Sequence, residues 1–203
     1  MSKIIKDTMA LTVITLVAGL ALGGVHAITK EPIARQQEKA KIEAYQEVFA
    51  DADTFETIEL TEELTVQLRE NLESENLAAQ EIVEIMQVLD KGGNSLGYAF
   101  QILSGGGYGG DIQFSVGIQK DGTVNGISIL SISETAGLGM NANTDRFKSQ
   151  FADKNVAAFE VTKKGAVSDE QIDALSGATI TSKCMVNGVN AGICAFHVLE
   201  GGN

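Results

Sequence analysis

The sequence predicts an α+β fold, in which an N-terminal transmembrane helix precedes one domain with an antiparallel sheet and flanking helices. Between residues 81 and 133, segments rich in β-branched and aromatic residues alternate with short turns that contain glycine or asparagine. Strands joined by such tight turns pair antiparallel. Near the C-terminus, a longer apolar segment is typical of a helix. A chain of 203 residues can hold one ordinary domain and an appendage.

The first element is a run of 20 residues without a formal charge, from Thr8 to Ala27. In a helix, such a run spans about 30 Å, which matches the hydrocarbon core of a bilayer. Lys3 and Lys6 precede it and favour a cytoplasmic N-terminus. We therefore expect a cytoplasmic tail (1–7), a transmembrane helix (8–28) and an extracytoplasmic domain. The alternative is a signal peptide that is cleaved after Ala27.

A charged helical region is expected at 29–80, with one helix from Glu31 to Ala50 and Pro32 at its start. Between Glu31 and Asp90 the chain has 16 acidic and 4 basic residues, and the formal net charge of the whole chain is -12. This composition excludes nucleic acid as a partner, because phosphate backbones need clustered Lys and Arg. The acidic segment is either a solvated face or a docking surface for a basic partner.

The domain core is expected at 81–203. Its strand candidates are residues 81–90, 96–104, 111–119 and 123–133. Its helix candidates are Thr144–Phe151, Ser168–Leu175 and Lys183–Leu199, although glycines at 188 and 192 weaken the last of these.

The cysteines argue against a metal centre. Cys184 and Cys194 lie ten residues apart without a CxxC or CxxCH motif, and the two histidines are isolated. We therefore do not expect structural zinc, a cysteine-held iron–sulfur cluster or attached haem. Both cysteines are interpreted as small buried residues. If this protein carries electrons, it needs an organic cofactor.

Three glycine-rich loops interrupt the domain, at residues 104–111, 134–140 and 176–179. None of them is a P-loop or a dinucleotide fingerprint. Glycine lets backbone N–H groups approach a ligand closely, so three such loops favour a flat or phosphorylated ligand. Ordinary turns in a glycine-rich protein are the alternative.

The third loop, "SGATITS", opens into the last predicted helix. Unpaired N–H groups at a helix start stabilise a phosphate. Ser176 and Gly177 would make the turn, Ala178 would leave room, and Thr179 would present its hydroxyl group. Thr181 or Ser182 could cap the helix. From these residues alone, hydroxyl groups that merely cap the helix are the simpler interpretation.

"LSGATITS" resembles the flavinylation motif of the FMN-binding domain family. That family includes the G subunit of the Rnf electron-transport complex and the C subunit of the sodium-translocating NADH:quinone reductase. The resemblance implies FMN joined to Thr179 by a phosphoester bond. The family's E-T-P-G-L-G loop, which lies against the flavin, is matched by Glu134, Thr135, Gly137, Leu138 and Gly139, with Ala136 in place of the proline.

Chain length and organisation are more similar to the Rnf-type subunit. The resemblance implies a single-pass plasma-membrane flavoprotein that relays electrons within a ferredoxin:NAD oxidoreductase coupled to sodium or proton translocation. It implies a subunit of a translocase, without catalytic or metal-binding residues of its own. Its partners would be the other membrane subunits and a flavin transferase that uses FAD and magnesium. A non-redox scaffold on the cell surface and a stand-alone extracytoplasmic flavin domain are the alternatives.

Overall fold

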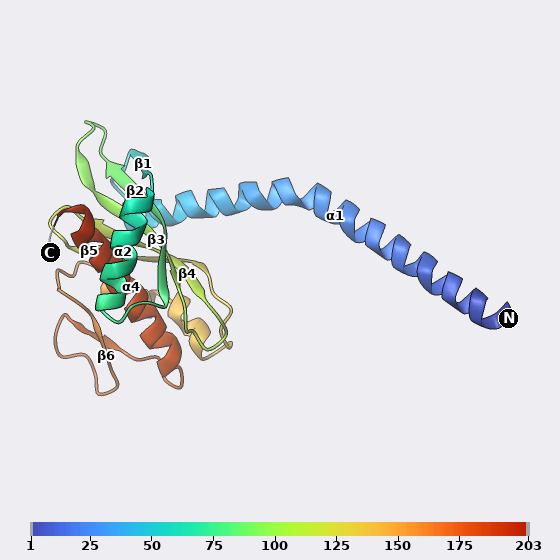
Figure 1. Cartoon of the computed structure of the whole chain (residues 1–203). Helices are drawn as coiled ribbons and strands as arrows, with labels where there is room; N and C mark the ends of the chain where they lie inside the picture. Colours follow the sequence, from blue (N-terminus) through green and yellow to red (C-terminus); the bar gives the residue numbers. More distant parts are fainter. Residues whose placement is uncertain (1, 202–203) are drawn as a thin grey trace. The chain divides into compact units, whose positions relative to one another are not determined.

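A computed structural model of the chain describes residues 2–201. The chain divides into two compact units, residues 1–40 and residues 41–203. Within its described residues, the first unit is entirely helical, and the second unit contains all the strands (Figure 1).

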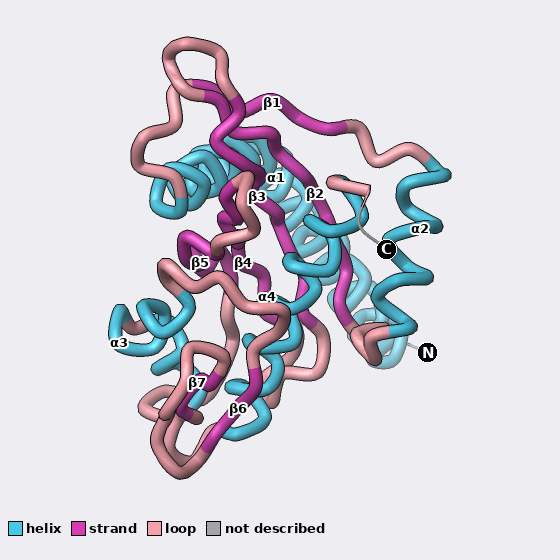
Figure 2. The backbone as a smooth tube through the Cα atoms, turned by 90° about the vertical axis from the view of Figure 1, so that its left-hand side faces the viewer, coloured by secondary structure: helices cyan, strands magenta, loops and turns pink. Residues whose placement is uncertain are grey.

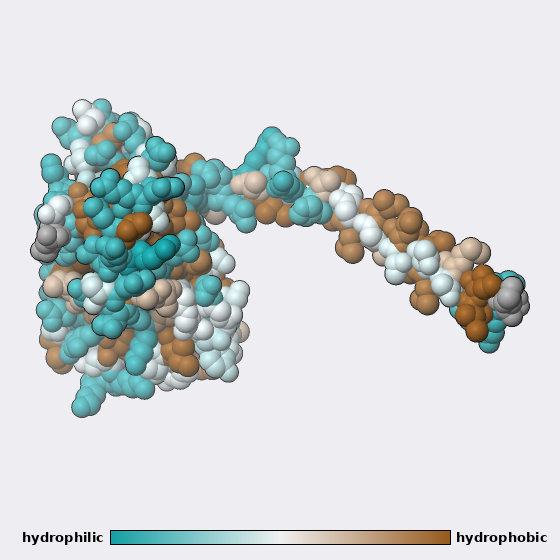
Figure 3. Space-filling model, viewed as in Figure 1, coloured by the Kyte–Doolittle hydropathy of each residue, from teal (hydrophilic) through white to brown (hydrophobic). Residues whose placement is uncertain are grey.

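Helix α1 extends from Ser2 to Val48 and contains Pro32 in its interior. Residues 31–48 are helical as predicted, but Pro32 does not begin a second helix. A proline inside a helix removes one backbone hydrogen bond, and the strong helix formers around it (Ala, Arg, Gln, Glu and Lys) continue the helix. The most apolar 18-residue stretch of α1 has a mean hydropathy of 2.0, so its length and composition allow it to cross a membrane. Apolar side chains are exposed along this part of the helix (Figure 3).

The sheet has five antiparallel strands in the order β1-β2-β3-β4-β5 (Figure 2). The four predicted strands are confirmed, and each of their ends lies within two residues of the predicted position. The strands are β1 (Thr54–Ile58), β2 (Gln80–Leu89), β3 (Ser95–Ser104), β4 (Ile112–Gln119) and β5 (Val124–Ser131). The sequence prediction missed β1 and also α2 (Glu62–Ser74), so residues 29–80 are not helical throughout.

The two faces of the sheet are covered by different helices. Val116 on β4 lies beneath Gly192 of α4 (Thr179–Leu199), whereas its neighbour Gly117 lies beneath Val48 at the end of α1. Successive strand residues point to opposite faces, so α4 and the last residues of α1 (41–48), which belong to the second unit, cover opposite sides. Helix α2 packs beside α4 and contributes the buried side chains of Leu68 and Leu72.

The prediction of a helix at Ser168–Leu175 is wrong. This segment contains strand β7 (Gln171–Asp173), which pairs in parallel with β6 (Glu160–Thr162) in a separate two-stranded sheet. The side chain of Gln150 accepts a hydrogen bond from Asp173 N at 2.7 Å and holds this backbone extended.

The helix predicted at Thr144–Phe151 occurs as two shorter turns. These are α3 (Asp145–Lys148) and the 3₁₀ turn η2 (Ser149–Phe151), and the 3₁₀ turn η1 (Gly139–Asn143) precedes them.

Candidate functional site

Two of the glycine-rich loops and the first turn of α4 close around one cavity of about 500 Å³, and Tyr108 of the remaining loop also lines it. Most of the residues predicted from the sequence lie together in its wall. The lining residues are Tyr108, Glu134, Thr135, Leu138, Gly139, Gly177, Ala178, Thr179, Ile180 and Thr181. Ser176 and Gly137 were also predicted for the site, but they do not belong to this lining and lie exposed in the adjoining turns.

Helix α4 starts four residues earlier than predicted. Ala178 is its N-cap residue, Thr179 is its first residue, and no side chain caps the helix. The expected cap by Thr181 or Ser182 is therefore wrong. Ser182 instead accepts a hydrogen bond from Leu175 N and donates one to Ala178 O, each at 2.9 Å. These bonds fix the turn before the helix and leave the first N–H groups of α4 without a side-chain acceptor, where an anion is stabilised.

Thr181 supplies a polar atom without a partner. Its side chain is 1 % exposed, and its Oγ1 atom has no hydrogen-bond partner among the described residues. A buried hydroxyl group without a partner is costly, so the Thr181 hydroxyl group fits a bound ligand atom that forms a hydrogen bond with it. The wall that contains Thr179 therefore fits a ligand with hydrogen-bonding groups.

Glu134 connects two of the loops from within. It is 9 % exposed, and its Oε1 atom accepts a hydrogen bond from Gly109 N at 3.2 Å. A Cβ atom on Gly139 would lie 2.5 Å from Oε2 of Glu134 and 2.7 Å from Oγ1 of Thr181. Only glycine allows this approach, so residue 139 brings the second loop against the first turn of α4.

The mouth of the cavity is apolar. Tyr108, Leu138 and Ile180 are 72 %, 43 % and 53 % exposed. Gly177 has a positive φ of 73°, and a Cβ atom there would lie 3.0 Å from Cδ2 of Leu138. Large apolar side chains that stay exposed around a cavity suit a flat aromatic ligand. Tyr108 and Ile180 were not predicted for the site, although Tyr108 lies among the glycines of the loop at residues 104–111.

The neighbouring thiol is not poised for chemistry. Burial raises the pKa of Cys184, a hydrogen bond with Ser104 opposes this, and the charges of Glu134 and Asp111 raise it further. Both cysteines are free, and the described residues contain no group of three side chains that could hold a metal ion. The prediction that both cysteines are small buried residues is confirmed for Cys184, whereas Cys194 is only half-buried.

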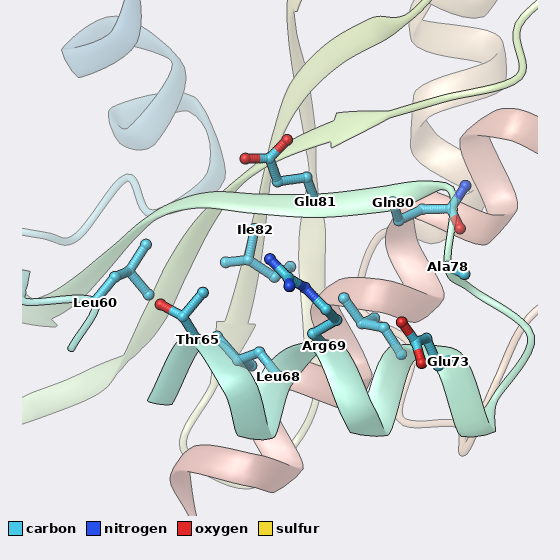
Figure 4. A pocket seen from close by; sticks show the side chains of 10 residues that line it. Leu60, Thr65, Leu68, Arg69, Glu73, Ala78, Gln80, Glu81 and Ile82 are labelled. Carbon is cyan, nitrogen blue, oxygen red and sulfur yellow. The ribbon is translucent and has the colours of Figure 1, made fainter. Parts of the chain in front are cut away.

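A second hollow lies between α2 and β2 (Figure 4). Its floor is formed by Leu68, Leu72 and Ile82, and Arg69, Glu73 and Glu81 surround it. It contains none of the residues predicted for the site and no glycine-rich loop, so it does not compete with the cavity at α4.

The cavity at α4 combines an uncapped helix start with an apolar mouth, and this arrangement fits a domain that binds a phosphorylated ligand with a flat apolar part. Residues 107–193 match the FMN-binding domain, and residues 1–48 match the RnfG N-terminal region.

Three relatives align over nearly the whole chain. The G subunit of the proton-translocating ferredoxin:NAD(+) oxidoreductase complex of Clostridium ljungdahlii is 31% identical and covers 99% of this chain and 96% of its own. The Na(+)-translocating counterpart of Acetobacterium woodii is 30% identical, with 97% and 93% covered. The G subunit of the ion-translocating oxidoreductase complex of Methanosarcina acetivorans is 30% identical, with 98% and 97% covered. The chain belongs to this family of G subunits of Rnf complexes.

Two solved structures resemble the chain. NqrC of Shewanella oneidensis has a TM-score of 0.49 at 20% identity and covers 58% of this chain and 61% of its own. The C subunit of the Na(+)-translocating NADH-quinone reductase from Parabacteroides distasonis has a TM-score of 0.48 at 18% identity, with 72% and 76% covered.

Proposed function

We propose that this protein is the membrane-anchored flavoprotein subunit of an Rnf-type complex, and that it relays electrons through FMN attached covalently to Thr179. The observation that carries the proposal is the uncapped first turn of α4, where Thr179 and the buried, unpartnered hydroxyl group of Thr181 line the same cavity. When bound, FMN supplies the reversible electron transfer that no side chain of this protein can supply.

The residues in the cavity have separable roles toward FMN. The first N–H groups of α4 and the Thr181 hydroxyl group would hold the phosphate. Tyr108, Leu138 and Ile180, which form the mouth, would pack against the flavin ring and exclude water from part of it. Glu134 would hold the loops together at the inner end.

Attachment requires a second protein, a flavin transferase that uses FAD and magnesium. A bond forms between Oγ of Thr179 and the phosphorus atom on the FMN side of FAD. The phosphoanhydride bond of FAD breaks, AMP leaves, and the hydroxyl proton passes to a base of the transferase. The side chain of Thr179 is partly exposed, which makes its hydroxyl group accessible for this reaction.

The names of the relatives place their complexes between ferredoxin and NAD with coupled translocation of protons or sodium ions. We transfer this setting to the present chain, with the other membrane subunits as its partners. The apolar run of α1 has no ionisable residue at its centre, so the chain itself offers no path for an ion. Lys3 and Lys6 favour an N-terminus inside the plasma membrane and a flavin-bearing domain outside.

The covalent bond is tested by producing the full chain together with a flavin transferase. A denaturing gel should show a band that fluoresces under ultraviolet light, with the mass increase of one FMN minus one water. Thr179→Ala should abolish the fluorescence completely, because it removes the acceptor oxygen. Thr179→Ser, which keeps the hydroxyl group, should retain it. If Thr181→Ala abolishes the modification and Thr179→Ala does not, the acceptor is assigned to the wrong residue.

A further inference from the structure

Lys183 lies on the same face of α4 as Thr179, four residues further along the helix. Side chains at this spacing have Cβ atoms about 5–6 Å apart. Cβ atoms of a helix tilt toward its N-terminus, which directs the long side chain of Lys183 back over the turn that begins at Thr179.

The ammonium group of Lys183 is available for a ligand. Its side chain is exposed, and it forms no hydrogen bond or ion pair with the described residues. By contrast, Lys148 pairs with Glu47 at 2.7 Å, and Lys154 pairs with Asp169. An exposed lysine is most often only solvated, so its availability alone assigns no role.

The cavity lining contains no basic residue that could balance the charge of a phosphate. Among the ten lining residues, Glu134 is acidic and none is basic. A phosphodiester at Thr179 would add another negative charge to a chain whose formal net charge is already -12. The helix N-terminus supplies only about half a positive charge. Lys183 is the one Lys or Arg residue of α4, and its spacing would place it near a phosphate bound to Thr179.

We propose that Lys183 is a positioning residue that neutralises the phosphate at Thr179 and draws FAD to the acceptor hydroxyl group during attachment. This inference rests on the proposed function. Thr181 independently supports a phosphate site at this turn, because its unpartnered Oγ1 atom is buried and its side chain lines the same cavity as Thr179. The phosphate would thus lie between a hydroxyl group inside the domain and an ammonium group on its surface.

The test measures initial rates of FMN attachment to the full-length chain in detergent, with flavin transferase, FAD and Mg²⁺, by in-gel fluorescence. Lys183→Gln should slow attachment at low salt by about two- to fivefold, which corresponds to the loss of one surface charge interaction. Lys183→Arg should restore the rate. High salt should remove the difference between Lys183→Gln and the unchanged chain, because salt screens exposed charges.

Lys91→Gln is the matched control. It removes the same charge from the turn between β2 and β3, at the far end of β3 from Ser104, which contacts α4 at Cys184. Its rate should equal that of the unchanged chain. An equal slowing by Lys91→Gln would show an effect of net charge and overturn the inference.

The inference and the proposed function fail in different ways. If Lys183→Gln is modified at the normal rate at low salt while Thr179→Ala stays unmodified, Lys183 has no such role and the proposed function stands. If the unchanged chain stays unmodified, or Thr179→Ala is modified, the proposed function falls and this inference falls with it.

Discussion

Single residues decide how the cavity closes. Gly139 lets the second glycine-rich loop pack against α4. A Cβ atom at residue 139 would collide with Oε2 of Glu134 and Oγ1 of Thr181. Both neighbours are buried, so neither can move toward solvent. The loop and the helix therefore meet through polar atoms around a glycine.

Gly139→Ala should consequently lower the free energy of unfolding by about 1–3 kcal/mol, because an added methyl group in a packed site forces its neighbours to shift. Urea unfolding of the full chain followed by circular dichroism measures this change. FMN attachment should fall as well, because the shift moves Thr181. Gly24→Ala in α1 is the control, since a Cβ atom there meets nothing within 4 Å. Equal stability of both variants would contradict the packing argument.

The sequence motifs contain most of the residues that line the candidate cavity, because the residues before and after a helix start are adjacent along the chain. Glu134, Leu138 and Gly139 were expected near Thr179 from the family resemblance, and the structure places them in one lining. Tyr108 and Ile180 could not be predicted in the same way. Their exposure at the cavity depends on the tertiary arrangement of three separate loops, and no local sequence pattern encodes that arrangement.

At the scale of elements, α4 shows packing that overrides helix propensity. Gly188 and Gly192 weaken the helix by about 1 kcal/mol each compared with alanine. A Cβ atom on Gly188 would lie 2.5 Å from Cζ of Phe114, so the glycine lets α4 lie directly on the sheet. The helix forms because its buried face has this close contact.

The two glycines should respond differently to alanine. Gly188→Ala should destabilise the domain by about 1–3 kcal/mol, because the aromatic ring of Phe114 is buried and cannot move aside. Gly192→Ala should be neutral or slightly stabilising. Its Cβ atom would lie 3.2 Å from the flexible end of the Ile102 side chain, and alanine has a higher helix propensity than glycine. Thermal unfolding of both variants gives the comparison. A larger loss for Gly192→Ala would contradict it.

The antiparallel meander was predictable because each turn and each alternating strand is a local signal. The edge strand β1 was not, since its residues are mostly exposed and its pairing partner β2 lies more than 20 residues away. Strand β7 was missed for a similar reason. Its extended backbone depends on Gln150 and on parallel pairing with β6, which are tertiary contacts.

At the scale of the whole molecule, an apolar helix and an acidic domain belong to one chain. The apolar run contains no formal charge from Thr8 to Ala27, and large side chains such as Leu20 are exposed along it. A helix that is apolar all round needs a bilayer or a partner to cover it.

We therefore expect the chain to keep this helix after export. The chain purified from membranes should begin at Met1 or Ser2, as N-terminal sequencing would show. Protease added outside intact spheroplasts should degrade the domain while the membrane shields the span. A mature chain that begins near Ile28 would establish cleavage, and a protected domain would contradict the proposed orientation.

The wall of the cavity comes from three segments that lie far apart in the sequence, around residues 108, 134–139 and 177–181. If FMN is attached at Thr179 as proposed, its ring would contact a wall that exists only in the folded state. A free ligand stabilises a protein in proportion to the logarithm of its concentration. A tethered ligand cannot be diluted. Its contribution to the free energy of unfolding of the domain would therefore be the same in a crowded cell and in a dilute extract.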